Sequence, residues 1–264
     1  MHLADSDRKR AALSKARAGL WVPILAAAMF VFAGDRPMGE ADAKASELAE
    51  KTMMAMGGWD QWEQTRFIAW TFFGRRHHVW DKHSGDIRVE TPEKEQVILM
   101  NVHTKEGRAW EKGEPVEDET ALATLLDFGY KVWINDAYWL VMPYKLRDPG
   151  VTLTYTREDK TEAGEEAQVL TMTFQDVGVT PENKYEVFID KKDFLVKQWS
   201  FFPKAEDSEP RFSTPWADWR TYGSIKLSGN RGKAQLDDIA VFNTLPTTVF
   251  SDPAPWRTNV PSEE

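Results

Sequence analysis

The 264-residue sequence contains no cysteine, which excludes disulfides, thiolate metal sites, a cysteine nucleophile and a lipidated N-terminal cysteine. Basic residues are also outnumbered by acidic ones, since the sequence has 33 lysines and arginines and 42 aspartates and glutamates. The net charge of −9 argues against a nucleic-acid partner. No Gly-x-Ser-x-Gly, Walker or Gly-x-Gly-x-x-Gly motif is present, and no internal repeat. We therefore expect a non-enzymatic protein without a cofactor, although a glycosidase-type pair of carboxylates from distant strands stays open.

A long apolar run occurs near the N-terminus and is too short for a bilayer. Leu20–Ala33 is uncharged over 14 residues, whereas a spanning helix needs about 20. It follows a basic lead, and Val31 and Ala33 suit positions −3 and −1 of a cleavage site before Gly34. We predict a signal peptide at residues 1–33 and an exported protein in the periplasm or cell envelope. An uncleaved anchor and a buried helix are the alternatives. The basic lead consists of Arg8, Lys9, Arg10, Lys15 and Arg17.

Most of the remaining chain has the period of two that is typical of strands. A helix is predicted at 41–56 and a short helical turn at 59–65, before the first strand. In that strand Ile68, Trp70 and Phe72 face one way, and Phe67, Ala69 and Thr71 face the other. The short connections indicate an antiparallel meander. Strands are expected at 66–73, 77–80, 87–89, 96–102, 107–112, 151–157, 168–175, 184–190, 194–202, 219–228 and 233–242.

One helical stretch interrupts the meander at residues 118–146, where Gly129 and Pro143 are expected to act as breaks between one or two helices. We divide the chain into a signal peptide at 1–33, a linker at 34–44, one domain at 45–253 and an acidic tail at 254–264. The expected fold is mainly β (α+β). The residue pattern predicts an antiparallel sheet with helices at the N-terminus and in the middle of the chain.

Several strands are apolar on both faces, among them 66–73, 96–102 and 194–202. A strand exposed on one face should alternate, so both faces of this sheet must be covered. Helices can cover one face. The other face requires a second sheet, a ligand or a partner, although a closed barrel with a packed interior would produce the same pattern.

Four segments together resemble a known family: WTFFGRRHHVWDKHSGD (70–86), WLVMPYKLRDPGVTL (139–153), KYEVFIDKKDFLVKQW (184–199) and VFSDP (249–253). They are similar to the bacterial lipoprotein-sorting group with a LolA/LolB-like half-barrel, in particular its uncharacterised exported relatives. The resemblance covers roughly residues 45–253. It implies a curved antiparallel sheet that forms an incomplete half-barrel, with the N-terminal and mid-chain helices as a lid. Its concave apolar face would hold lipid or lipoprotein acyl chains.

Apolar side chains on these strands and helices are the candidate ligand site. Aromatic and methionine side chains supply apolar area and adapt their shape to a ligand. Each one is also explained by an ordinary core role. The candidate wall and lid residues are Ile68, Trp70, Phe72, Trp80, Leu99, Trp133, Trp139 and Met142.

The basic cluster around Arg75 and Arg76 is a candidate contact for a lipid headgroup or an acidic partner, although such clusters usually neutralise nearby carboxylates. Substituting both with serine is expected to weaken headgroup-dependent binding and to leave folding intact. His77 and His78 point to opposite faces of a strand, so they do not share a metal ion. We predict surface histidines and no metal site.

Three functions follow. The first is an exported carrier or sensor that shelters a hydrophobic ligand, either lipid or lipoprotein acyl chains. The second is an envelope interaction module with a self-filled barrel and an envelope protein as its partner. The third is an envelope hydrolase. Without residues 1–33, which hold five basic and two acidic side chains, the chain carries −12 and is repelled by anionic lipid headgroups.

Overall fold

The computed structural model describes residues 37–175 and 180–259. The predicted signal peptide, its cleavage site and the end of the acidic tail lie outside the described residues. Residues from Pro37 onward form one unit by their contacts. Within the described part, no helix combines the length and the apolar character needed to cross a bilayer.

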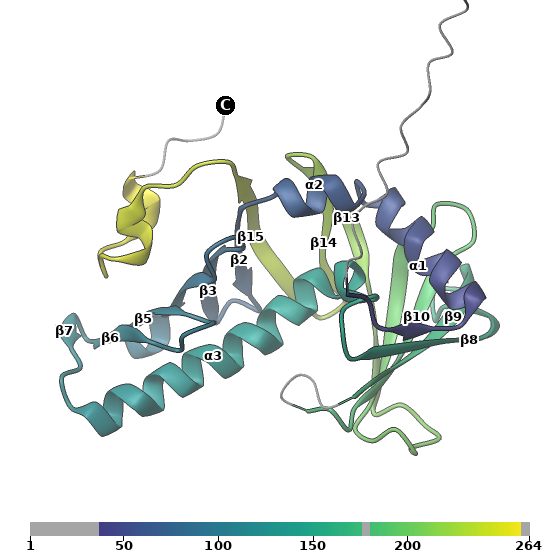
Figure 1. The fold of residues 1–264 in the computed structure, drawn as a ribbon, viewed down its shortest axis with the longest axis horizontal. Coiled ribbons are helices and arrows are strands. Elements are labelled where there is room, and N and C mark those ends of the chain that lie inside the picture. Colours follow the sequence, from purple (N-terminus) through teal and green to yellow (C-terminus); the bar gives the residue numbers. More distant parts are fainter. Residues whose placement is uncertain (1–36, 176–179, 260–264) are drawn as a thin grey trace, which may run out of the picture. The chain divides into compact units, whose positions relative to one another are not determined.

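Nine strands form the larger sheet (Figure 1), and all of its pairings are antiparallel. The meander from β2 to β6 agrees with the strands predicted between residues 66 and 112. In spatial order the strands are β13 (Ala217–Tyr222), β14 (Ile225–Arg231), β15 (Ala234–Phe242), β2 (Phe67–Phe72), β3 (Arg76–Asp81), β4 (Asp86–Thr91), β5 (Gln96–Asn101), β6 (Gly107–Glu111) and β7 (Glu114–Pro115).

Six strands form the smaller sheet, which is antiparallel except where β1 pairs with β8. Its last strand leads directly into β13 of the larger sheet through Trp216, whose backbone N–H donates to the Lys197 carbonyl at 2.6 Å. In spatial order the strands are β1 (Glu40–Ala41), β8 (Val151–Lys160), β9 (Glu166–Phe174), β10 (Lys184–Asp190), β11 (Val196–Phe202) and β12 (Phe212–Pro215).

The sheets are curved and, over the described residues, do not close into a barrel, which confirms the predicted half-barrel with helices. Irregular register contributes to the bending, because β-bulges increase local twist. The pairing shifts between Asp237 and Ala240 in β15, between Tyr155 and Arg157 in β8, and between Phe188 and Ile189 in β10.

The mid-chain helical stretch is one continuous helix, α3 (Glu119–Val141), followed by a 3₁₀ turn, η2 (Met142–Lys145). The expected break at Gly129 is wrong. Gly129 is buried, and a Cβ there would lie 3.0 Å from Ile98 Cγ2 of β5. The glycine therefore lets the helix approach the sheet closely. Near the N-terminus, α1 (Ala43–Ala55) and α2 (Trp59–Gln64) agree with the predicted helix and short helical turn.

Both faces of the central strands are covered by this chain itself. On one face, α3 packs against β4, β5, β6 and β14 (Figure 1). On the other face, Val249 and Trp256 of the C-terminal segment pack against Ala69 and Val79. The sequence predicts a second sheet, a ligand or a partner on this face. In this part of the sheet, residues 245–256 cover it instead.

Arg88 of β4 fastens the C-terminal segment. It is 1% exposed, and its guanidinium donates to the backbone carbonyls of Val249, Asp252, Pro253 and Ala254 at 2.7–3.1 Å. Four bonds from a charged donor satisfy carbonyls that the folded chain removes from water. The segment includes two 3₁₀ turns, η3 (Thr247–Phe250) and η4 (Trp256–Asn259). Another 3₁₀ turn, η1 (Pro92–Lys94), precedes β5.

Two further predictions need correction. The single strand expected at 219–228 is a hairpin, β13 and β14, because Gly223 at φ +58° makes the turn between them. His78 is not a surface histidine, since it is 1% exposed beneath α3.

Candidate functional site

Polar contacts fix the middle of α3 to the larger sheet. Asp136 is fully buried, and its carboxylate accepts two hydrogen bonds from the Arg76 guanidinium at 2.6 and 2.9 Å. His78 Nε2 lies 2.7 Å from the same carboxylate, and Asn135 donates to it at 2.9 Å. The Trp70 ring stacks on His78 with a centroid separation of 4.7 Å. The helix is therefore held in one register.

Burial determines the protonation of this cluster. It lowers the pKa of His78 more than the neighbouring carboxylate raises it, so the imidazole is neutral and Nε2–H donates to Asp136. Burial also raises the pKa of Asp136. Hydrogen bonds from His78 and Arg76 outweigh that effect and hold the pKa below its usual value. The cluster therefore pairs one ionised carboxylate, that of Asp136, with one guanidinium, that of Arg76.

Arg231 fixes the end of α3. It is 2% exposed, donates from Nη2 to the Trp139 carbonyl at 2.7 Å, and lies 3.5 Å above the Trp216 ring. Burial holds its pKa well below the usual range. A cation at the last turn of a helix satisfies a carbonyl that has no partner within the helix.

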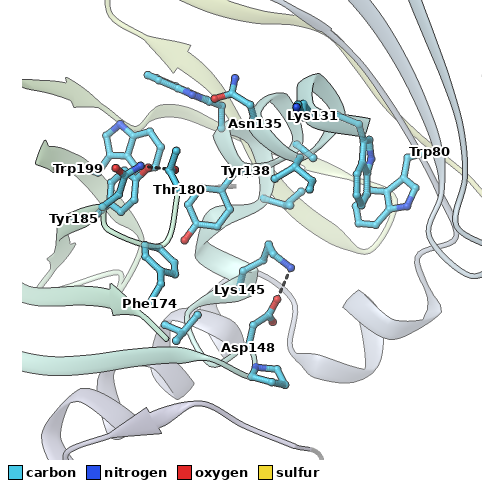
Figure 2. Close-up of a pocket in the computed structure, with 18 residues that line it drawn as sticks. Trp80, Lys131, Asn135, Tyr138, Lys145, Asp148, Phe174, Thr180, Tyr185 and Trp199 are labelled. Carbon is cyan, nitrogen blue, oxygen red and sulfur yellow. Dashed lines mark hydrogen bonds and ion pairs between the residues drawn. The ribbon is translucent and has the colours of Figure 1, made fainter. Parts of the chain in front are cut away.

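A cavity of about 440 Å³ lies along this anchored helix, between α3 and the smaller sheet (Figure 2). It reaches from Trp80 of β3 to Trp199 of β11, and most of its surface is apolar. That volume is within the roughly 300–1,000 Å³ typical of small-molecule sites. The lining residues are Trp80, Lys131, Trp133, Ile134, Asn135, Ala137, Tyr138, Trp139, Val141, Lys145, Asp148, Pro149, Val151, Phe174, Thr180, Asn183, Tyr185 and Trp199.

Four aromatic rings form the wall on the side of the smaller sheet. Tyr138 of α3 lies 6.0–6.3 Å from Phe174, Tyr185 and Trp199, and the last two are stacked at 4.8 Å. Because the rings pack against one another, they present a continuous apolar surface. Burial raises the pKa of Tyr185 to about 12, so this wall is uncharged at neutral pH.

The predicted wall residues fall into two groups. Trp80, Trp133 and Trp139 line the cavity. Ile68, Trp70 and Phe72 are buried in the core beneath α3, and Met142 lies in the core next to α1. Leu99 is buried on the face of β5 opposite Ile98 and Met100, which contact α3. The role of the eight residues in ligand binding stays a prediction.

The predicted headgroup arginines have different surroundings. Arg75 is exposed, whereas Arg76 is paired with the buried Asp136. Replacing Arg76 would strip a buried carboxylate of its cation. The expectation that serine at both positions leaves folding intact therefore no longer holds for Arg76.

The cavity includes residues that sequence reasoning did not single out: Tyr138, Phe174, Tyr185 and Trp199. Tyr185 and Trp199 belong to a segment that carried the family resemblance, and Tyr138 is next to Trp139. The alternating pattern of β10 and β11 could have shown that Tyr185 and Trp199 face inward. It could not show that their rings would pack against Tyr138 of α3.

A second polar cluster has the residue types of a catalytic triad but not its order. Thr71 donates to Asp238 at 2.6 Å, and His77 Nδ1 lies 2.7 Å from the same hydroxyl oxygen. In a triad the hydroxyl donates to the histidine, which is oriented by the acid. Here the hydroxyl hydrogen bonds to the carboxylate, so the histidine does not activate it.

No protein-family model and no curated protein matches the sequence. Several solved structures are similar to the chain, including the following three. One is a domain from Vibrio parahaemolyticus described as an outer membrane lipoprotein-sorting protein, with 9% identity and a TM-score of 0.41, covering 78% of this chain and 96% of that one. The second is a DUF1329 family protein from Desulfovibrio piger, with 10% identity and a TM-score of 0.42 over 80% and 98%.

The third is a LolA superfamily protein from Nitrosomonas europaea, with 14% identity and a TM-score of 0.40, covering 78% of this chain and 96% of that one. The first and third descriptions name the group that the sequence resembles.

Proposed function

We propose that this protein binds a hydrophobic ligand in the cavity along α3 and acts as a non-enzymatic carrier or sensor in the cell envelope. The observation that carries the proposal is the apolar cavity of about 440 Å³ beside an anchored helix. Each buried methylene of a ligand contributes about 0.8 kcal/mol. A lipid acyl chain is therefore the class of ligand that gains most there. Export by the N-terminal segment is part of the proposal.

Filling the cavity should weaken ligand binding. Ile134→Trp places an indole into the space from α3, and Ala123→Trp, on an exposed position of the same helix, is the matched control. Native mass spectrometry with organic extraction would identify co-purifying lipid, and thermal shift would report its rebinding. We expect lipid on the wild type and on Ala123→Trp, and at least about tenfold less on Ile134→Trp, because excluding one or two methylenes already reaches that factor. A wild type without lipid and without a thermal shift on adding lipid would contradict the proposal.

The interaction-module hypothesis has one observation in its favour. Ile68, Trp70 and Met142 have no exposed surface, so much of the sheet's inner face is filled by the protein's own residues. The same experiment separates the two functions, because a self-filled module stays empty in native mass spectrometry.

A further inference from the structure

The size of the cavity corresponds to one acyl chain. A volume of about 440 Å³ is in the lower part of the range for sites that enclose a single drug-sized molecule. One long acyl chain has a volume comparable to that of such a molecule. The two chains of a phospholipid or the three chains of a lipoprotein, together with their headgroups, are much larger.

The shape of the cavity favours an extended ligand. The lining residues on α3 run from Lys131 to Val141, ten residues apart, which corresponds to about 15 Å of helix. Over this length Trp133, Ala137 and other apolar side chains contribute to the lining. A single extended chain matches a cavity that follows one helix.

Two lysines, Lys131 and Lys145, border the cavity together with one acid, Asp148, and can meet an anionic headgroup. Lys145 pairs with Asp148, and both are more than a third exposed. Lys131 pairs with Asp127 at 2.7 Å, and both are more than half exposed. Ion pairs this exposed contribute little, so either lysine can turn to a ligand at small cost.

We infer that the cavity takes a single-chain amphiphile with an anionic headgroup, of the fatty-acid class, with its apolar chain along α3 and its anion at Lys131 or Lys145. This inference rests on the proposed function. It narrows the lipid to one class and excludes multi-chain lipids as occupants of this cavity.

Bound acyl chains can be detected through the tryptophans of the cavity. Trp80, Trp133, Trp139 and Trp199 line it, so a brominated chain that enters will quench their fluorescence. The full chain, delipidated on a hydrophobic resin, is titrated with 9,10-dibromostearate, followed by displacement with palmitate, monopalmitoyl glycerol, lysophosphatidylglycerol and dipalmitoyl phosphatidylglycerol. Native mass spectrometry counts the bound molecules.

We expect one palmitate per chain, bound about tenfold more tightly than the neutral monopalmitoyl glycerol, the effect of one charge-assisted hydrogen bond. The Lys131→Gln/Lys145→Gln double variant should remove that difference. Lys51→Gln should retain it, because Lys51 is paired with Glu47 in the same i,i+4 geometry as Lys131 but lies on α1 outside the cavity. Equal affinity for lysophosphatidylglycerol supports the inference and indicates a lysolipid as the source of the anion.

Other outcomes overturn the inference while leaving the proposed function intact. Binding of dipalmitoyl phosphatidylglycerol as tight as that of palmitate, or two palmitates per chain, removes the single-chain limit. Equal affinity for monopalmitoyl glycerol removes the preference for an anion. If none of these compounds binds, the proposed function fails together with the inference.

Discussion

The imidazole of His78 is enclosed between the Trp70 ring and the Asp136 carboxylate, and its Nδ1 has no hydrogen-bond partner in the described structure. A neutral histidine fits there, because burial of a second positive charge beside Arg76 is opposed by desolvation. The contact joins β3 to α3, so its protonation state affects how firmly the helix is held.

This contact predicts a pH dependence of stability. The pKa of His78 is lowered in the folded state from its ordinary value of 6.5, so the unfolded chain binds the extra proton first as pH falls. The free energy of unfolding should therefore be highest above about pH 6.5 and decrease below it, by at most about 1.4 kcal/mol per pH unit for one proton. Asp136 adds a second loss below its ordinary value of 3.8, since its pKa is also lowered.

Urea denaturation at pH 7.5 and 5.5 would measure the effect. His78→Gln lacks a titratable group, so its free energy of unfolding should change less between these two values than that of the wild type. His83→Gln, at a turn outside the helix interface, is the control and should keep the wild-type dependence. An identical pH dependence in the wild type and His78→Gln would contradict the assignment.

At the level of the element, α3 depends on a residue that lowers helix propensity. Glycine in a helix interior costs about 1 kcal/mol relative to alanine. Gly129 is used because Ile98 Cγ2 and Met100 Sδ would lie only 3.0 and 3.3 Å from a side chain there. Close packing of α3 on β5 compensates for the lower propensity.

Gly129→Val should destabilise the protein despite the higher helix propensity of valine. Its side chain would push α3 away from β5, and overpacking of this kind costs about 1–3 kcal/mol. Ala123→Val on the exposed face of α3 is the control, with only its propensity cost. Chemical denaturation would compare the two, and equal losses would show that the helix is not in close contact with the sheet.

At the scale of the whole described unit, the C-terminal segment covers the face of the sheet opposite α3. Its Val249 and Trp256 are buried, and Arg88 holds its backbone. The segment continues past the predicted end of the domain at residue 253, since Trp256 is 6% exposed. It explains why strands such as β2 are apolar on both faces without a partner.

Removing residues 245–264 should expose Ala69 and Val79 and take away the four carbonyls that accept from the Arg88 guanidinium, which keeps Glu90 as a partner. Losing the buried side chains of Val249 and Trp256 should lower the free energy of unfolding by about 3–6 kcal/mol. The melting temperature should therefore fall by several degrees or more. The uncovered apolar surface should cause self-association, measured by light scattering. A truncation after Asn259 keeps the segment and should behave as the wild type. A monomer with an unchanged melting temperature after the longer deletion would contradict this role.

The sequence by itself determined what depends on neighbours along the chain. The period of two assigned Ile68, Trp70 and Phe72 to one face of β2 and Ala69 to the other, and helical spacing located α1 and the stretch that became α3. These local patterns indicated an antiparallel sheet with helices, and the half-barrel followed from the resemblance to a known family.

Only the tertiary structure decided which side chains meet across long separations. Asp136 contacts His78 over 58 positions, and Arg88 reaches residues more than 160 positions away. It also decided that Trp80, Trp133 and Trp139 border open space while Trp70 is packed in the core. Alternation specifies the face of a strand but not what covers that face, because the covering element comes from a distant part of the chain. The cavity is the space that α3 leaves beside the smaller sheet, and no local pattern records it.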